Sequence, residues 1–142
     1  MNNSSPRTFV FQATLTASNG SIQFVDGGQD SSGCLFSLGW NYNSNQMVYH
    51  FSYDDNTNWY ELQEGSYMIA FVYDGETLSL YVNGQLVDSS EHGLDTSGSN
   101  YYIGNYGPDS IYSMHGEWKS KFCIIYDRAL EQSEIASFNK FA

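Results

Sequence analysis

The chain has 142 residues, 17% of them aromatic, and its 16 Asp and Glu outnumber five Lys and Arg, which gives a formal net charge of −11. This length predicts one domain with a single core. Residues 8–118 contain no Lys or Arg, so the charge excludes ligands rich in phosphate, sulfate or uronic acid, including nucleic acids and anionic membranes.

The sequence shows neither a membrane-spanning run nor a targeting segment. No apolar stretch is long enough to cross a membrane as a helix, and the start MNNSSPR lacks the pattern of a signal peptide. We interpret residues 1–7 as a polar lead-in and 8–142 as one domain of a longer protein. A cytosolic N-terminus is the alternative.

Most of the chain has the pattern of short β-strands. Residues 8–16 alternate in polarity, which predicts a strand with one apolar face. Further strands are predicted over 21–25, 34–40, 46–53, 66–73, 77–83, 85–89, 100–104 and 121–126, and a single helix over 131–140. The dipeptides Asp74-Gly75 and Asn83-Gly84 predict hairpin turns of type I′. Together these elements predict an all-β fold: a two-sheet antiparallel β-sandwich, or jelly roll, with one short C-terminal helix.

The alternation also predicts which side chains face the core. In the strand 66–73 the inward residues are Tyr67, Ile69, Phe71 and Tyr73, and the outward ones are Met68, Ala70 and Val72. If the strands 46–53, 66–73 and 77–83 are neighbours, their outer faces form one semi-apolar floor that carries His50 and Tyr81. The alternative is that loops or the C-terminal helix cover this floor.

Two cysteines, Cys34 and Cys123, match no metal-binding spacing. Alternation places Cys34 on the face of Phe36 and Leu38, and Cys123 on the face of Ile125. We therefore expect both to be buried, either as free thiols or as one disulfide.

The second half of the chain resembles a known family, the concanavalin A-like, laminin G-like jelly rolls. The motifs that carry the resemblance are Tyr73-Asp74-Gly75, Leu80-Tyr81-Val82-Asn83-Gly84, Ile103-Gly104, Ile125-Tyr126, Arg128-Ala129-Leu130 and Glu134-Ile135. The resemblance covers residues 67–138 well and 8–53 loosely, and it implies the fold, which hosts many functions. An acidic segment that can serve a calcium site in the family is replaced here by residues 116–121, GEWKSK, so the resemblance carries no calcium site to that segment.

An enzyme is not expected. Glycoside hydrolysis needs two carboxylates about 5–10 Å apart. Glucanases of this fold carry them on one strand in a pattern such as Glu-x-Asp-x-x-Glu, which no predicted strand has. His50, His92 and His115 are too scattered to indicate a catalytic triad.

The aromatic residues indicate a binding function. Residues 105–118, NYGPDSIYSMHGEW, have no period that would bury their rings. Rings stack on the apolar faces of sugars, while Asn, Asp and His pair with sugar hydroxyls. Trp40 continues an inward face and is expected in the core, whereas Trp59 and Tyr60 are open between core and ligand. The candidate ligand-binding residues are Tyr42, His50, Trp59, Tyr60, Tyr81, Tyr106, Tyr112 and His115.

The acidic surface has three interpretations: solubility, affinity for calcium, or preference for a neutral ligand. The best calcium candidate is the turn Asp54, Asp55 and Asn56, and Asp26 with Asp30 is second. Calcium takes 6–8 oxygen ligands and neither cluster supplies more than half, so an ordinary solvated turn is the alternative.

These observations predict a non-catalytic, lectin-like carbohydrate-binding module for a neutral polysaccharide or glycan. We expect it to be an extracellular or cell-surface domain of a multidomain protein. The alternatives are a protein–protein adhesion module and a structural or assembly domain of the same fold, because the same composition suits a protein-binding surface.

Overall fold

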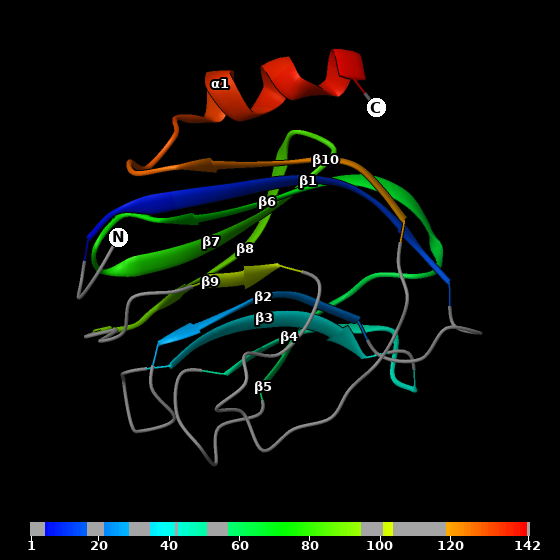
Figure 1. The fold of residues 1–142 in the computed structure, drawn as a ribbon, viewed down its shortest axis with the longest axis horizontal. Coiled ribbons are helices and arrows are strands. Elements are labelled where there is room, and N and C mark those ends of the chain that lie inside the picture. Colours follow the sequence, from blue (N-terminus) through cyan, green and yellow to red (C-terminus); the bar gives the residue numbers. More distant parts are fainter. Residues whose placement is uncertain are drawn as a thin grey trace.

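The computed structural model describes residues 5–16, 22–28, 35–41, 43–50, 57–94, 101–103 and 119–141. Within these residues two antiparallel five-stranded sheets form a β-sandwich, and a short helix follows the last strand, so the predicted fold class is confirmed. Figure 1 shows the sheets as two stacked layers, with the helix on the outside of one of them. No helix in the described part of the chain is long and apolar enough to cross a membrane.

Each sheet mixes strands from distant parts of the sequence. The first sheet contains, in spatial order, β10 (Lys119–Tyr126), β1 (Arg7–Leu15), β6 (Gly65–Tyr73), β7 (Thr77–Val82) and β8 (Gln85–Glu91). The second contains β5 (Thr57–Glu61), β4 (Gln46–His50), β3 (Leu35–Asn41), β2 (Ile22–Gly28) and β9 (Tyr101–Ile103). The helix α1 (Gln132–Ser137) continues into the 3₁₀ turn η2 (Phe138–Phe141), so the predicted helix over 131–140 is present but changes its winding near the end.

The two predicted hairpin turns differ. Asn83 and Gly84 have φ angles of 50° and 80°, as a type I′ turn requires, and they join β7 to β8. At the other turn only Gly75 has a positive φ, of 109°, so the prediction of type I′ is wrong there. The Asp74 carboxylate closes that turn instead, because its Oδ1 accepts hydrogen bonds from the N–H groups of Glu76 and Thr77 at 2.9 and 2.7 Å.

The predicted register of β6 is confirmed, and it serves two apolar clusters at once. Ile69 and Phe71 are fully buried between the two sheets, where the rings of Phe11, Phe24 and Phe71 lie 5.6 to 6.2 Å apart. The alternate residues of β6 are also buried, but on the other side of the sheet and beneath α1. The central strand of this sheet is therefore buried on both faces.

Cys123 lies on the expected face but is not buried. It pairs with Phe11, and Ile125 pairs with Phe9, so both point to the side of the sandwich core. However, β10 is an edge strand, and Cys123 is an exposed free thiol there. The prediction that Cys123 is buried is wrong because alternation reports the face of a strand and not its distance from the sheet edge. Cys34 lies outside the described residues.

Candidate functional site on the second sheet

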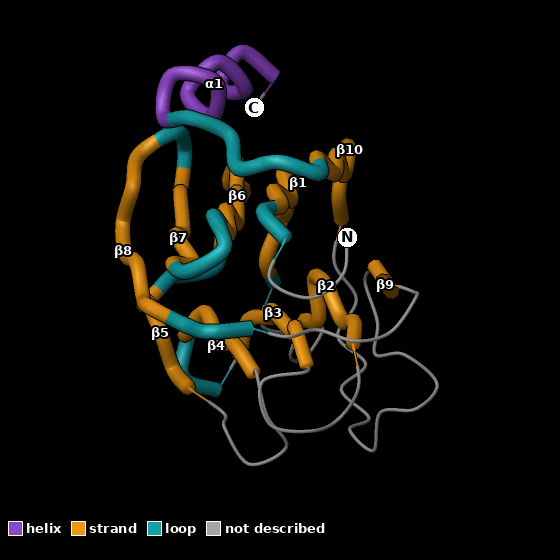
Figure 2. The backbone as a smooth tube through the Cα atoms, turned by 90° about the vertical axis from the view of Figure 1, so that its left-hand side faces the viewer, coloured by secondary structure: helices purple, strands orange, loops and turns teal. Residues whose placement is uncertain are grey.

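The outer face of the first sheet is closed by the C-terminal helix. Its buried cluster consists of Val10, Met68, Ala70, Val72, Leu130 and Ile135. Figure 2 shows α1 over this sheet, on the side away from the second sheet. Tyr81 is half-buried and packs against the same cluster. The helix thus covers the outer face of β6 and β7, which was part of the floor considered for a ligand.

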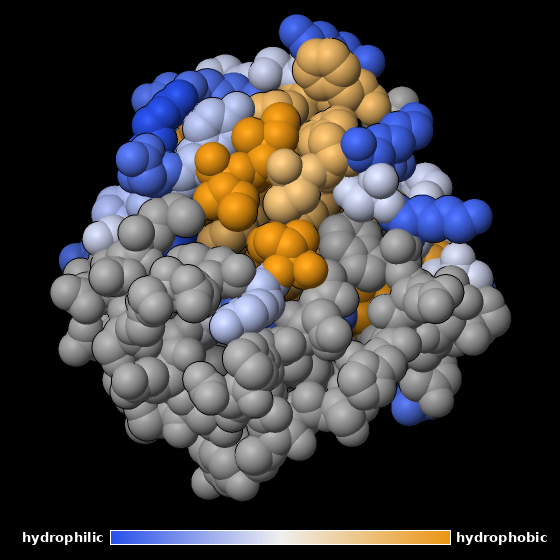
Figure 3. Space-filling view, viewed as in Figure 1, coloured by the Kyte–Doolittle hydropathy of each residue, from blue (hydrophilic) through white to orange (hydrophobic). Residues whose placement is uncertain are grey.

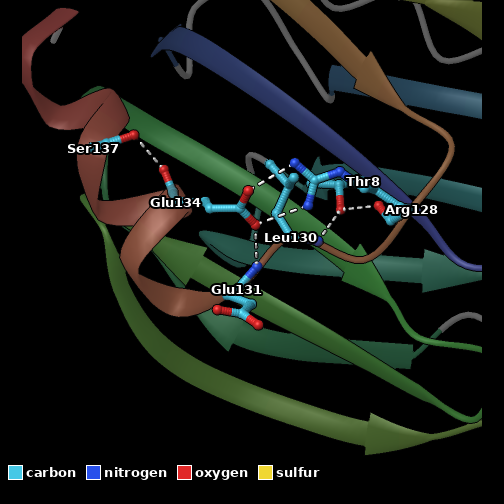
Figure 4. A network of polar contacts seen from close by, with 6 residues as sticks. All are labelled: Thr8, Arg128, Leu130, Glu131, Glu134 and Ser137. Atoms are coloured by element: carbon cyan, nitrogen blue, oxygen red, sulfur yellow. Dashed lines mark hydrogen bonds and ion pairs between the residues drawn. The ribbon is translucent and has the colours of Figure 1, made fainter.

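Charged and polar groups connect α1 to the turn that precedes it, and this turn to β1. Arg128 donates two hydrogen bonds to the Glu134 carboxylate at 2.7 and 2.9 Å, and the Glu131 N–H donates a third at 2.9 Å (Figure 4). The hydrogen bonds from Arg128 have the largest effect on the pKa of Glu134, followed by the bond from the Glu131 N–H. Together they lower this pKa from 4.5 to about 2. The bond to Glu134 also raises the pKa of Arg128. Thr8 ties the preceding turn to β1, because its hydroxyl donates to the Arg128 carbonyl and accepts from the Leu130 N–H at 2.8 and 3.0 Å.

His50 and Tyr81 do not share a floor. The strand β4, which ends at His50, belongs to the second sheet, whereas β6 and β7 belong to the first. The three-strand floor is therefore not formed, and the position of His50 belongs to the outer face of the opposite sheet.

A row of polar residues crosses that outer face. Asp26 pairs with Tyr102 on one side and with Ser37 on the other, and Ser37 in turn pairs with His50. Residues that pair directly across antiparallel strands share a face, so these four positions lie side by side. Asp26 and Ser37 are buried and Tyr102 is half-buried. We call Tyr102, Asp26, Ser37, His50 and the adjacent Gln23 the polar face.

Gln23 brings an unpaired acceptor to the polar face. Its Nε2 donates to the Val25 carbonyl at 2.6 Å and to the Ser37 hydroxyl at 2.5 Å. A carbonyl oxygen can only accept, so these bonds determine which end of the amide is nitrogen. The other end, Oε1, is buried without a hydrogen-bond partner, and a Cβ added to Gly39 would lie 3.2 Å from it. A buried acceptor without a donor costs about 1–3 kcal/mol, so a hydroxyl or amide proton would stabilise this position.

A β-bulge turns Trp59 and Tyr60 toward the core. Residues 57–61 were not predicted as a strand, yet they form the edge strand β5. The pairing with β4 shifts between Met47 and Val48, which leaves Trp59 as the extra residue. Both aromatic residues of β5 therefore pack, half-buried, against the core.

The rings of two tryptophans, Trp40 and Trp59, pack inside the sandwich. Trp59 stacks on Phe71, with ring centroids 6.5 Å apart, and meets Tyr49 edge-on at 5.4 Å. Trp40 is fully buried, as predicted, and its Nε1 donates to the Leu62 carbonyl at 2.8 Å. The Nε1 of Trp59 is also buried but has no hydrogen-bond partner.

Several predicted site residues lie outside the described residues. These are Tyr42, Asp54, Asp55, Asn56, Tyr106, Tyr112 and His115. The described residues contain no group of three or more His, Cys, Asp and Glu that could hold a metal ion.

Sequence reasoning missed most of the polar face. Gln23, Ser37 and Tyr102 were not considered, and Asp26 was considered only as a calcium ligand. A local signal exists, because Gln23 and Ser37 are polar residues at outward positions of apolar strands. Their proximity depends on strand pairing across the sheet, which the spacing of residues along the chain does not specify.

The fold is shared with larger proteins of known structure. The sialidase of Trypanosoma rangeli matches with a TM-score of 0.66 and 19% identity, over 96% of this chain and 22% of the sialidase. The binding domain of botulinum neurotoxin DC, solved in complex with rat synaptotagmin II, matches with a TM-score of 0.67 and 15% identity, over 97% and 36% of the two chains. These likenesses concern the fold alone, and the chain spans only a part of each structure.

Sequence comparison gives one family. The family model described as the concanavalin A-like lectin/glucanases superfamily matches residues 2–136. A search of curated proteins finds no match.

Proposed function

The chain belongs to the concanavalin A-like lectin/glucanase superfamily, and we propose that it is a non-catalytic module that binds a neutral glycan on the polar face. In this proposal His50 and Tyr102 contact the ligand, and Tyr42, Tyr106, Tyr112 and His115 supply aromatic and hydrogen-bonding contacts. Trp59, Tyr60 and Tyr81 have supporting roles, since they pack against apolar clusters.

One observation carries the proposal: within the part of the chain that the structure describes, the polar face has a buried acceptor, Oε1 of Gln23, with no hydrogen-bond partner. The opposite outer face is apolar and lies beneath α1, whereas the polar face combines a carboxylate, a hydroxyl and the free Oε1 of Gln23. Sugars are rich in hydroxyl groups that donate to such acceptors. This supports a polyhydroxylated ligand rather than an apolar one.

Charge supports a neutral ligand. Asp26 is the one acidic residue of the polar face, and no Lys or Arg belongs to that face. A sulfate or carboxylate on the ligand would meet repulsion there without a compensating cation. A charge-neutral glycan avoids this cost.

The non-catalytic part of the proposal has its own support. Glycoside hydrolysis commonly uses two carboxylates that flank the bond, and the polar face has only Asp26. We expect no release of chromophore from aryl glycosides, including a sialoside. Steady hydrolysis that scales with the concentration of the pure domain would contradict this part.

The binding experiment combines a glycan array with affinity electrophoresis through gels of soluble β-glucan, mannan and xylan. We expect retardation by at least one neutral glycan, and a loss of about 1–3 kcal/mol of binding free energy in Tyr102→Ala and in Tyr106→Ala. Leu86→Ala is the matched control, because Leu86 is 49% exposed but lies on the first sheet. The proposal fails if no glycan binds, or if Tyr102→Ala binds as well as the control.

A protein ligand is the second candidate. It is favoured by the similarity in fold to a toxin domain whose structure includes a bound protein. We further propose that the domain is part of a larger extracellular or cell-surface protein, which agrees with its matching only a part of longer chains. Labelling of intact cells with an antibody against the domain would test that location.

A further inference from the structure

The free cations of this acidic chain gather at one edge of the first sheet. The chain has five Lys and Arg. Arg7 is buried, and Arg128 is paired with Glu134. The other three, Lys119, Lys121 and Lys140, are exposed.

These three lysines lie close to one another in the fold. Lys119 and Lys121 begin the edge strand β10. The segment that holds Lys140 packs on the same strand, because the rings of Phe138 and Phe141 lie 6.5 and 6.2 Å from that of Phe122. The β10 edge therefore carries the positive charge of an otherwise negative molecule.

The β10 edge is also apolar. Ile125 is 40% exposed, and the exposed Cys123 lies between it and Lys121 along the strand. Phe141, which packs on Phe122, is 52% exposed. Figure 3 shows apolar side chains gathered at the level of β10, below the C-terminal segment, with hydrophilic side chains on both sides. Cations that flank exposed apolar groups fit a partner with anions that flank apolar groups.

The other edge of the same sheet has that complementary composition. Near its start the strand β8 carries Leu86, which is 49% exposed, and it continues to Asp88 and the exposed Glu91. Within the described residues β8 pairs only with β7, and β10 pairs only with β1. Among these described residues, both edges therefore present backbone groups that another strand can pair with.

The order of residues selects the direction of pairing. In β10 the lysines come first and Ile125 follows, whereas in β8 Leu86 comes first and the acidic residues follow. An antiparallel alignment with Ile125 opposite Leu86 places Glu91 opposite Ser120, between Lys119 and Lys121, and Asp88 opposite Cys123. A parallel alignment would place the lysines against Leu86.

The faces of the two strands agree with this direction. Ile125 pairs with Phe9 and faces the sandwich core, whereas Leu86 pairs with Tyr81 and faces the side of α1. Consider a half-turn of the second copy about an axis that lies in the sheet, perpendicular to the strands. This rotation reverses the direction of its strands and exchanges the two faces of its sheet. One rotation thus makes the strands antiparallel and brings both apolar side chains to the same face.

We infer that β10 of one copy of this chain binds β8 of a second copy, antiparallel, and extends the first sheet across both. The contact joins different surfaces of the two copies, so it can repeat and form longer assemblies. Two molecules of charge −11 repel each other at long range, but this repulsion is screened beyond about 8 Å at physiological salt. Contacts between Lys and carboxylate at the shared edge lie within that distance.

Sedimentation velocity of the 142-residue chain tests the inference. In about 0.15 M salt, with a reducing agent that keeps Cys123 from forming disulfides, we expect the average mass to rise with protein concentration. The variant Lys119→Glu/Lys121→Glu should associate about tenfold more weakly, or not at all. Asp88→Lys/Glu91→Lys should show the same loss.

A mixture of these two variants provides the decisive measurement. Each supplies the charges that the other lacks, so the mixture should regain association that neither variant shows alone. The single variants Lys121→Glu and Lys140→Glu form the matched comparison, because each reverses one charge and only Lys121 lies in β10. Circular dichroism and thermal melts should match those of the original chain for all variants. A chain that stays monomeric at every concentration, or edge variants that behave like Lys140→Glu, would overturn the inference.

Discussion

At the scale of single residues, burial of a ring does not mean that its polar atom is satisfied. Trp40 and Trp59 both pack in the sandwich, but only the Nε1 of Trp40 donates a hydrogen bond, to the Leu62 carbonyl. Trp40 was predicted from strand alternation. Trp59 was left open because residues 57–61 were not predicted as a strand, and alternation would not have placed a residue that a bulge inserts.

This difference predicts that the same conservative substitution destabilises the protein more at Trp40 than at Trp59. Trp40→Phe leaves the Leu62 carbonyl without its donor and should lower the free energy of unfolding by about 1–3 kcal/mol from that group alone. Trp59→Phe keeps an aromatic ring against Phe71 and removes a donor that has no partner, so it should cost less. Trp59→Ala should cost about 3 kcal/mol, because it deletes a large ring that packs on the core. Urea unfolding measures the stability of all three variants. An unchanged stability in Trp59→Ala would show that Trp59 does not pack on the core.

We expect Cys123 to react slowly with alkylating reagents, although it is exposed. Desolvation raises the pKa of this thiol from 9.0 to about 11, and only the thiolate attacks alkylating reagents. At neutral pH the thiolate fraction is therefore about a hundredfold lower than that of a thiol with the ordinary value. In a Cys34→Ser variant, the alkylation rate of the native protein should keep rising with pH until about 11. A rate that levels off near pH 9 would contradict the raised pKa.

At the scale of elements, local patterns predicted the hairpin at Asn83-Gly84 and the register of β6, but not the turn type at Asp74-Gly75 or the strand β5. The hairpin at Asn83-Gly84 needs two residues that tolerate positive φ, and the register of β6 follows from its alternation. The helix was predicted, but its fastening was not. Glu is not among the residue types preferred at a helix N-cap. At Glu131 the backbone N–H is nevertheless satisfied, because it donates to the carboxylate of Glu134, three positions later.

The Arg128–Glu134 pair makes the docking of α1 dependent on pH. The pKa of Glu134 falls from 4.5 to about 2 on folding, so ionised Glu134 favours the folded form above pH 4.5. That contribution decreases as the pH falls below 4.5 and is lost as the pH passes through about 2. Glu134→Gln should remove this part of the pH dependence and loosen the helix at neutral pH, which would expose the cluster that contains Val10 and Ile135.

Binding of an apolar dye, followed from pH 5 to pH 2, measures this effect. The original chain should bind more dye as the pH falls, and Glu134→Gln should bind dye already at pH 5. Glu131→Gln is the control, because Glu131 contributes its backbone N–H to the pair. Equal behaviour of the two variants would show that the ion pair does not hold the helix.

At the scale of the whole molecule, the candidate site was the part least accessible to sequence reasoning. Asp26, Ser37 and His50 come from three strands, and strand pairing alone brings them together. Conversely, the predicted floor needed β4 beside β6, and the chain instead crosses from one sheet to the other between these strands. Composition and charge, which need no topology, led to the proposed class of ligand, and alternation predicted the faces of the strands. Which faces meet is decided by long-range packing.

The net charge of −11 predicts that dissolved cations stabilise the whole domain. Sodium chloride should raise the melting temperature by screening repulsion among carboxylates. A more specific prediction concerns calcium. If the turn Asp54-Asp55-Asn56 binds calcium in the folded state only, then millimolar calcium should raise the melting temperature beyond a sodium chloride solution of equal ionic strength, and increasingly with concentration. Asp54→Asn/Asp55→Asn should remove this excess while leaving the response to sodium chloride. Equal melting temperatures in chelator, in calcium and in matched sodium chloride would leave the acidic residues with a role in solubility and in the choice of a neutral ligand.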